Sequence, residues 1–495
     1  MSHFRRVLVA NRGAISVRIQ KTLACMGIPA AAVYSEADSA ALHVLVAERA
    51  ACIGPGPARE SYLKAEALID AAHSMHCDAL HPGYGFLSEN AVFAEQVRAA
   101  GLCFIGPSAS AMRSMGDKSL ARGIATQAGV ACVPGFDAEA DDRTLHAEAQ
   151  RIGFPLLIKA AHGGGGKGMR AVHEAREFDA ALAAARRESL AAFGRSEVLL
   201  ERLVGRARHV EIQLLADQHG AVHAFAEREC SLQRRHQKVL EESPSAAVNE
   251  ELRARLQSAA VAIAKAVHYE GAGTIEFLLE PDGRFWFLEM NTRLQVEHGV
   301  TELVSGEDLV EWQVRIASGE HLPQGLPSTA RGHAMQVRLY AEDPAQGFLP
   351  QTGTLGQVRW PLGPGLRVDA GVVSGAVLSH YYDPMLAKLL AHGRDREQCR
   401  SRLQEALRCT QVSGATTNIE WLGRLVDHAC VRAAQTYTHT LQDLQMPTKV
   451  AADSAVWAAA AALALRANAT HSAESARPAL PSECLNGFRL GGTQP

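Results

Sequence analysis

The stretch 273–297 reads GTIEFLLEPDGRFWFLEMNTRLQVE, which is the pattern of a β-hairpin. Two runs of β-forming residues flank Asp282-Gly283, a dipeptide that suits a two-residue turn because both positions tolerate positive φ. This turn would place Glu276 directly opposite Glu289. Facing carboxylates repel each other unless a cation lies between them or one stays protonated. We therefore predict a divalent metal ion here, and an all-oxygen ligand set favours Mg²⁺ or Mn²⁺.

The alternation of side chains along the hairpin assigns its two faces. The apolar face, predicted to pack on the core, contains Ile275, Phe277, Leu279, Trp286, Leu288 and Met290. The opposite face contains Thr274, Glu276, Leu278, Phe287, Glu289 and Asn291, and is followed at every second position by Arg293, Gln295 and Glu297. An extended chain would direct these polar groups toward the predicted metal. The alternative is a solvated sheet face with incidental acids.

Length and composition narrow the class of protein. A chain of 495 residues exceeds the usual size of a single domain, so we expect two to four domains. The net charge of -3 provides no basic field for nucleic acid. No apolar run is long enough to span a bilayer, the ten cysteines contain no CxxC pair, and nothing at Met1 resembles a signal peptide. We expect a reduced, cytoplasmic protein that binds small molecules or proteins, with no nucleic-acid or membrane partner.

Short apolar strands alternate with helical periods from residue 5 to residue 105, which predicts a parallel α/β unit. The single Gly13 falls short of the GxGxxG dinucleotide fingerprint. The run HPGYGFLSEN at 81–90 follows a strand, and we predict a rigid loop at the edge where open sheets bind ligands. After residue 330 the pattern changes to that of an α+β region.

A second signal lies between two strand-like runs in 155–172, where four consecutive glycines occupy 163–166. Backbone N–H groups without side chains can surround phosphate oxygens, and Lys159 and Lys167 supply positive charge. It is not a Walker loop, because GK[ST] and the following helix are missing. A flexible surface turn is the alternative. Together with the predicted metal site, the pattern favours a lid over a nucleotide phosphate.

Several motifs occur in an order that identifies a family. They are ANRG at Ala10, HPGYGFLSEN at His81, MGDK at Met115, the GGGGKGMR lid, RHVEIQ at Arg208, ERECSLQRRHQK at Glu227, EMNTRLQVEH at Glu289 and YYDPMLAKL at Tyr381. From about residue 4 to residue 441 the chain resembles the biotin carboxylase component of biotin-dependent acyl-CoA carboxylases, an ATP-grasp enzyme.

The resemblance implies a multidomain fold of the α/β and α+β classes. A Rossmann-like parallel α/β domain (1–114) would precede an ATP-grasp domain (115–330), whose lid is about 135–204. A C-terminal α+β domain (331–446) would follow. The alanine-rich tail 447–495 looks like the start of a linking domain found in longer α subunits of the methylcrotonyl-CoA or geranyl-CoA carboxylase type.

The resemblance also implies the reaction. ATP phosphorylates bicarbonate to carboxyphosphate, this breaks down to CO₂ and phosphate, and biotin is carboxylated on its ureido nitrogen. The cofactors and substrates would be ATP, Mg²⁺ or Mn²⁺, bicarbonate, and biotin on a carrier. Because the chain contains no Met-Lys-Met biotin acceptor, it would work on a carrier in trans or be part of a longer subunit.

Individual residues receive roles from the same resemblance. Nucleotide would be bound by Lys118, Lys159, Gly164, Gly165, Gly166, Glu201, Val204, His209, Gln233, His236 and Leu278. Metal would be held by Glu276, Glu289 and Asn291. Bicarbonate would be bound by Lys238, Arg293, Gln295 and Val296. The base would be Glu297, whose ionised form we expect the guanidinium of Arg293 to favour. Biotin would contact Tyr84 and Arg338, with Arg338 stabilising its enolate.

The implied partners are a biotin carboxyl carrier protein or domain and a carboxyltransferase subunit. A homodimer through the helix 14–25 is implied by bacterial relatives, although the charged positions of this helix differ here. One rival is another ATP-grasp ligase, which makes carbamoyl phosphate or joins a carboxylate to an amine and would not need HPGYGFLSEN or Arg338. A second rival is a catalytically silent homologue, which should lack some of the set Glu276, Glu289, Arg293, Glu297 and Lys238.

Overall fold

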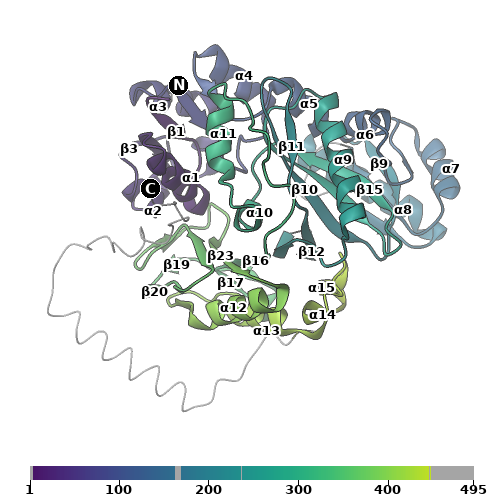
Figure 1. Ribbon diagram of the computed structural model, residues 1–495. Coiled ribbons are helices and arrows are strands. Elements are labelled where there is room, and N and C mark those ends of the chain that lie inside the picture. The colour runs from purple at the N-terminus through teal and green to yellow at the C-terminus, as the bar shows by residue number, and fades with distance from the viewer. Residues whose placement is uncertain (1–3, 162–168, 236, 445, 447–495) are drawn as a thin grey trace.

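The computed structural model describes residues 4–161, 169–235, 237–444 and 446 (Figure 1). Three predicted features lie outside these residues: the lid glycines Gly164, Gly165 and Gly166, the nucleotide ligand His236, and the alanine-rich tail 447–495. Within the described ranges, every helix is too short or too polar to span a bilayer.

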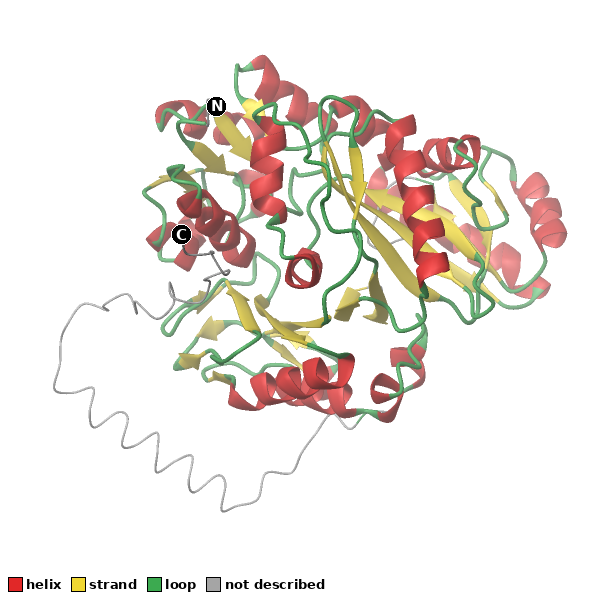
Figure 2. Ribbon diagram, in the orientation of Figure 1, coloured by secondary structure: helices red, strands yellow, loops and turns green. Residues whose placement is uncertain are grey.

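The N-terminal part confirms the predicted parallel α/β unit. Five parallel strands form a sheet in the order β3-β2-β1-β4-β5, with helices around it (Figure 2). The strands are β1 (Val7–Val9), β2 (Ala30–Tyr34), β3 (Arg49–Cys52), β4 (Ala79–His81) and β5 (Cys103–Phe104). The helices are α1 (Gly13–Cys25), α2 (Leu42–Leu45), α3 (Ala65–Ser74), α4 (Ala91–Ala99) and α5 (Ala109–Gly116).

The loop after β4 is held from both sides. Nδ1 of His81 accepts a hydrogen bond from the backbone N–H of Gly83 (3.0 Å). Nδ2 of Asn11 donates to the carbonyl oxygens of Pro82 and Tyr84, at 2.8 Å each. These bonds tie the loop to His81 at the end of β4 and to Asn11 after β1.

A second sheet, of nine strands, runs through most of the remaining chain. Its path is β15-β14-β10-β12-β13-β16-β23-β21, and β11 pairs with β10. The strands are β10 (Arg208–Ala216), β11 (Val222–Ala224), β12 (Arg228–Arg234), β13 (Gln237–Ser243), β14 (Gly271–Leu279), β15 (Phe285–Asn291), β16 (His333–Tyr340), β21 (Leu366–Ala370) and β23 (Met385–Gly393). Because β13 pairs directly with β16, the region after residue 330 shares a sheet with the hairpin.

Helices and small sheets cover this sheet and extend it. The helices are α6 (Lys118–Gln127), α9 (Glu250–Ala266), α10 (His298–Ser305), α11 (Leu309–Ala317), α12 (Arg396–Cys409), α13 (Ile419–Asp427), α14 (Ala429–Arg432) and α15 (Thr440–Asp443). The paired short strands are β17 (Glu342–Asp343) with β18 (Leu349–Pro350), β19 (Gly353–Thr354) with β22 (Val377–Leu378), and β20 (Val358–Arg359) with β24 (Gln411–Val412).

The region of the predicted lid has a small antiparallel sheet of its own, in the order β6-β9-β7-β8. Its strands are β6 (Gly135–Phe136), β7 (Leu156–Ala160), β8 (Arg170–Val172) and β9 (Val198–Arg202). Helices α7 (Asp142–Ile152) and α8 (Phe178–Phe193) pack on it through a separate apolar core that includes Ile158 and Phe178. In Figure 1 this unit lies at the edge of the molecule, beside β15 and α6.

The hairpin of β14 and β15 differs from the prediction in its turn. The N–H of Glu280 donates to the carbonyl oxygen of Arg284 (2.8 Å), so residues 281–283 form a three-residue loop, in which Gly283 has a φ of 82°. A bulge at Leu288 then restores the register, and Glu276 faces Glu289. The predicted pairing of the two acids is confirmed, although through two irregularities that cancel.

The bulge also changes which side chains reach the core. Phe287 is 1% exposed and packs in the same core as Phe277, its cross-strand partner. Nε1 of Trp286 instead donates a hydrogen bond to Glu280 (2.6 Å). The prediction that placed Trp286 and Leu288 on the core face and Phe287 on the polar face is therefore wrong, because the extra residue reverses the alternation between the turn and the bulge.

Candidate functional site

The acidic pair lies near the middle of the hairpin. Glu276 is 4% exposed, and burial together with the Glu276 carboxylate raises the pKa of Glu289. Within the described part of the chain, no group forms a hydrogen bond or an ion pair with the Glu289 carboxylate. A carboxylate without a partner beside a second acid is costly unless a cation joins them. The donor set, oxygens only, fits Mg²⁺ or Mn²⁺.

Glu276 has several polar partners. Its Oε1 accepts hydrogen bonds from Lys238 Nζ (2.8 Å), Asn291 Nδ2 (2.9 Å) and Gln295 Nε2 (2.8 Å). Its Oε2 lies 3.1 Å from Nε2 of His209. Burial alone would raise the pKa of Glu276, but Lys238 and His209 hold it well below its usual range. Glu276 is therefore ionised at neutral pH.

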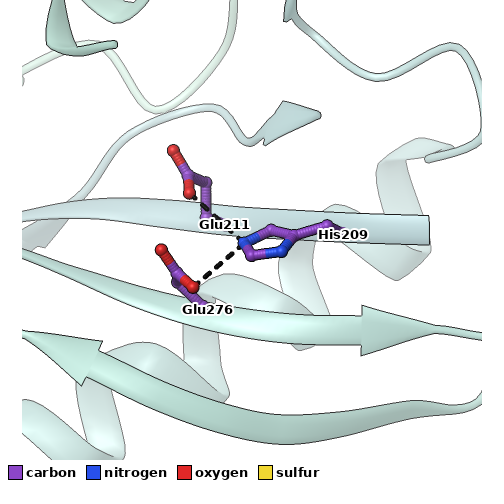
Figure 3. A group of neighbouring side chains, drawn as sticks. All are labelled: His209, Glu211 and Glu276. Atoms are coloured by element: carbon purple, nitrogen blue, oxygen red, sulfur yellow. Dashed lines mark ion pairs between the residues drawn. The ribbon is translucent and has the colours of Figure 1, made fainter. Parts of the chain in front are cut away.

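His209 projects from β10 toward the carboxylates of Glu211 and Glu276, as Figure 3 shows. Burial alone would lower the pKa of this imidazole, but the Glu276 carboxylate raises it to about 9. The ligand atoms of His209, Glu211 and Glu276 lie within 4.8 Å of one another, a spacing that a metal could use. The imidazole lies beside both carboxylates and can act as their counter-ion. The amide of Gln233 lies 2.9 Å from its Nδ1.

Lys238, on β13, joins three carboxylates. Its Nζ donates to Glu211 Oε2 (2.6 Å), Glu276 Oε1 (2.8 Å) and Glu297 Oε1 (2.6 Å). An ammonium group has three donors, so this arrangement uses all of them. One positive charge is thus shared among three negative ones, and the pKa of Lys238 is raised well above its usual value although burial opposes this.

Glu297 was predicted at the end of an extended polar row. It lies instead in the turn that precedes α10, and it is 2% exposed. Its Oε2 accepts a hydrogen bond from Arg338 (3.0 Å). Burial alone would raise the pKa of Glu297, but Lys238 and Arg338 lower it, so the carboxylate is ionised as a base must be.

The guanidinium expected beside Glu297 is bound elsewhere. Nε of Arg293 donates to Glu89 (2.9 Å), and its NH2 donates to Oδ1 of Asn291 (3.0 Å). Arg338, rather than Arg293, is the guanidinium in contact with Glu297. Glu89 belongs to the HPGYGFLSEN motif, so the N-terminal unit contributes directly to this site.

The described residues predicted to bind nucleotide lie around the same hairpin. Nζ of Lys118, at the start of α6, donates to Ala160 O (3.3 Å), and this ammonium interacts electrostatically with Glu289. Lys159 on β7 forms an ion pair with Glu201 on β9. Leu278 is paired with His209 across β14 and β10, and a half-buried Val204 follows β9.

Arg338 also bonds to Glu241 (2.6 Å), and it acts electrostatically on Tyr84. The Tyr84 hydroxyl is buried and has no hydrogen-bond partner in the described part of the protein. Burial raises the pKa of Tyr84, so the hydroxyl is neutral. The two residues predicted to contact biotin therefore lie near each other, and one has a free hydrogen-bonding group.

Sequence reasoning missed four charged residues of the site. They are Glu89, Glu211, Arg228 and Glu241. Arg228 is fully buried and donates hydrogen bonds to side chains from four segments: Glu211, Gln213, Thr274, Gln295 and Thr301. The alternation of β10 could have identified Glu211, because it is two residues from His209. No local pattern marks the others, since their partners are distant in sequence.

The fold and the site define the ATP-grasp class: a small lid sheet and a larger antiparallel sheet, with facing acids on a hairpin of the larger one. Family models match three successive regions. They are described as biotin carboxylase, N-terminal domain (3–112), carbamoyl-phosphate synthase L chain, ATP binding domain (117–325), and biotin carboxylase C-terminal domain (336–443).

Curated relatives and solved structures agree with these matches. The biotin carboxylase of Allochromatium vinosum is 45% identical over 443 residues, which cover 89% of this chain and 98% of that protein. The mitochondrial methylcrotonoyl-CoA carboxylase subunit alpha of rice is 49% identical over 444 residues, which cover 89% of this chain and 60% of the relative. The chain thus spans about three fifths of the length of that subunit.

Two solved structures show the same fold. The biotin carboxylase of Campylobacter jejuni, described as a β-γ-ATP complex, has a TM-score of 0.87 at 40% identity and covers 89% of this chain and 99% of its own. The biotin carboxylase domain dimer of the Hydrogenobacter thermophilus 2-oxoglutarate carboxylase, described in complex with MgADP, ADP and bicarbonate, has a TM-score of 0.88 at 38% identity and covers 91% and 100%. The chain belongs to the biotin carboxylase family.

Proposed function

We propose that this chain carries out the ATP- and bicarbonate-dependent carboxylation of biotin, the first half-reaction of a biotin-dependent acyl-CoA carboxylase. The observation that carries the proposal is the Glu297 carboxylate, which Lys238 and Arg338 hold ionised within the same cluster as the Glu276/Glu289 pair. A deprotonated base beside a predicted metal and phosphate site is what activation of bicarbonate requires. The ligands named for the Hydrogenobacter relative support the same assignment.

The nucleotide would lie between the small lid sheet and the hairpin. Lys118 and Lys159 would contact its phosphates, and Glu201, Val204, Gln233, His209 and Leu278 would hold the remainder. Glu276, Glu289 and Asn291 would hold Mg²⁺ or Mn²⁺, which when bound neutralises charge on the phosphoryl group. The Glu289 carboxylate, which has no hydrogen-bond or ion-pair partner among the described residues, supports this metal assignment.

Bicarbonate would bind between Lys238, Arg293, Gln295 and the backbone of Val296. Glu297 would accept its proton, and the resulting oxygen nucleophile would attack the terminal phosphoryl group, with ADP as the leaving group. Carboxyphosphate would then release CO₂ and phosphate. The cations Lys238 and Arg293 are required because bicarbonate and ATP are both anionic and would otherwise repel each other.

Biotin would be bound by Tyr84 and Arg338. Arg338 would stabilise the negative charge that develops on the ureido oxygen as the nitrogen loses its proton to the phosphate released from carboxyphosphate and attacks CO₂. The unpartnered Tyr84 hydroxyl supports a polar ligand at this position. The partners we propose are a biotin carrier protein or domain and a carboxyltransferase subunit. A homodimer is proposed because the Hydrogenobacter relative is described as one.

We also propose that the protein works in a reducing compartment, the cytoplasm. The nine cysteines of the described ranges are all free thiols, which supports it. The rice relative is described as mitochondrial, so the compartment is best tested by fractionation of the native cells.

The decisive experiment measures ADP release with ATP, Mg²⁺, bicarbonate and free biotin, each omitted in turn. Hydrolysis should require bicarbonate and Mg²⁺ and should rise when biotin is added. Ammonia or an amine as acceptor would support the rival ATP-grasp ligase instead. Hydrolysis that is indifferent to bicarbonate would overturn the proposed function, and the absence of any hydrolysis would favour a silent homologue.

A further inference from the structure

Three neighbouring strands of the nine-stranded sheet carry charged residues in one row. Arg338 on β16 is paired with Lys388 on β23, and Lys388 is paired with Asp369 on β21. Residues paired in this way point to the same face of a sheet. Two cations side by side destabilise a sheet unless other groups offset them, and here Glu241 and Glu297 offset Arg338 while Asp369 offsets Lys388.

Each cation of this row contacts a different residue of the turn before α10. Arg338 donates to the Glu297 carboxylate (3.0 Å), and Nζ of Lys388 donates to the backbone oxygen of Val296 (2.9 Å). Consecutive residues of the turn are thus held by adjacent strands. Nδ1 of His298 lies 2.6 Å from the carbonyl oxygen of Gln295, which ties the turn to the first residue of α10.

Lys388 has no exposed surface, and it forms an ion pair with Asp369. Its Nζ lies 3.1 Å from Oδ2 of Asp369, which Arg367 also contacts through two hydrogen bonds of 2.9 Å. Burial lowers the pKa of Lys388, and Asp369 opposes this. Replacing a whole buried ion pair by apolar side chains often costs little, so the Lys388–Asp369 pair is weak evidence for a role in stability alone. In addition to this ion pair, Lys388 donates a hydrogen bond to the backbone carbonyl of Val296, in the turn before α10.

We infer that Lys388 is a positioning residue for the bicarbonate site. The carbonyl of Val296 belongs to the planar peptide that joins Val296 to Glu297, so a hydrogen bond to its oxygen fixes the orientation of that whole plane. The plane sets the direction in which the Glu297 side chain leaves the backbone. Lys388 therefore orients Glu297 through the backbone, while Arg338 holds the Glu297 carboxylate. The inference rests on the proposed function for the role of Glu297.

The test compares Lys388→Met with Lys388→Arg and with Lys265→Met, a matched change at an exposed lysine of α9. In Lys388→Met, kcat/KM for bicarbonate should fall roughly 10- to 100-fold, the usual effect of losing a hydrogen bond from a charged donor. KM for ATP should change less than about twofold, since the nucleotide ligands do not contact Lys388. Lys388→Arg should recover part of the loss, and Lys265→Met should leave all constants unchanged.

Equal losses for bicarbonate and ATP would mean a purely structural role and would overturn the inference, as would unchanged constants. If Lys388→Met does not fold, Asp369→Asn takes its place. That variant removes the counter-ion and should raise KM for bicarbonate by a smaller factor of about 3 to 10; an unchanged KM would count against the inference.

A second readout does not depend on catalysis. Amide hydrogen exchange of a peptide spanning 295–300 should be faster in Lys388→Met than in the parent chain, because the turn loses its anchor. Unchanged exchange would overturn the positioning role even if the parent chain hydrolyses ATP. If the parent chain shows no bicarbonate-dependent hydrolysis but exchange is still faster in Lys388→Met, the positioning role stands and the proposed function is rejected.

Discussion

Two buried clusters of charged side chains differ in how their charges are paired. The catalytic cluster consists of His209, Glu211, Lys238, Glu276, Glu289, Glu297 and Arg338. The anchoring cluster consists of Arg18, Glu302, Asp308, Arg367, Asp369 and Lys388. In the anchoring cluster Glu302 bonds to both Arg18 (2.8 Å) and Arg367 (2.6 Å), and each of these arginines has a second acid. In the catalytic cluster three acids share Lys238, and Glu289 has no partner among the described residues.

The difference shows that a binding site gives up full compensation of its buried charges. A closed network of ion pairs compensates the cost of burial, whereas an incomplete one retains negative charge for which the protein supplies no cation. Such charge persists only where the surrounding fold is stable enough to hold it. We therefore expect substitutions in the two clusters to have opposite signatures, one in activity and the other in stability.

The largest effect is expected at Glu297. The substitution Glu297→Gln keeps the shape of the side chain but removes the base, so kcat should fall by about 10² to 10⁴. The free energy of unfolding should change little, since Lys238 retains Glu211 and Glu276. Steady-state ADP release and urea unfolding measure the two quantities. A rate within threefold of the parent would show that proton removal does not need Glu297.

Glu302→Gln should show the opposite signature. Removing the acid shared by Arg18 and Arg367 leaves buried guanidinium groups short of a partner, which costs about 3 kcal/mol of unfolding free energy. At temperatures where the variant is folded, kcat should remain within a few fold. Urea unfolding with parallel rate assays checks both.

The same variant gives a pH test. Burial alone would raise the pKa of Glu302, but Arg18 and Arg367 lower it. A group with a lowered pKa contributes stability that is present above its unfolded value near 4.5 and is lost as pH falls through the folded value. The stability difference between parent and variant should therefore shrink below about pH 4.5. A difference that stays constant with pH would show that the ionised Glu302 carboxylate is not its source.

Glu289→Gln gives the smallest change in stability and sharpens the contrast. Because its pKa is raised and it has no described partner, neutralising it should leave the metal-free protein as stable as the parent or slightly more so, by about 1 kcal/mol. The same change should raise the Mg²⁺ concentration needed for half-maximal rate by roughly tenfold or more. Magnesium titrations of ADP release, with thermal unfolding in EDTA, measure both. Loss of stability in EDTA would contradict the comparison.

Local pattern was enough to predict the parallel sheet, the hairpin and the facing of Glu276 with Glu289. It could not predict the turn, since Asp282-Gly283 suits both two- and three-residue loops. It also did not reveal the bulge, and for that reason the prediction placed Phe287 on the polar face instead of in the core. The position of Glu297 in a turn was missed because alternation continues past the end of β15.

Long-range contacts account for the rest of the site. Glu89 reaches Arg293 from more than two hundred positions away, and Arg228 gathers side chains from several strands. Such contacts leave no periodic trace in the sequence. Motif resemblance supplied the candidate site residues, but it did not show that Arg338, rather than Arg293, contacts Glu297.

The bulge and the turn place two segments of the hairpin outside its paired positions. Leu288 has no partner on β14, because Phe277 pairs with Phe287 and Glu276 pairs with Glu289. Removing Leu288 alone would join two segments that are already in register, so the two acids would still face each other. The loop 281–283 also lies outside the pairs that define the register. The facing of Glu276 and Glu289 should therefore tolerate the loss of one residue at the tip or at the bulge.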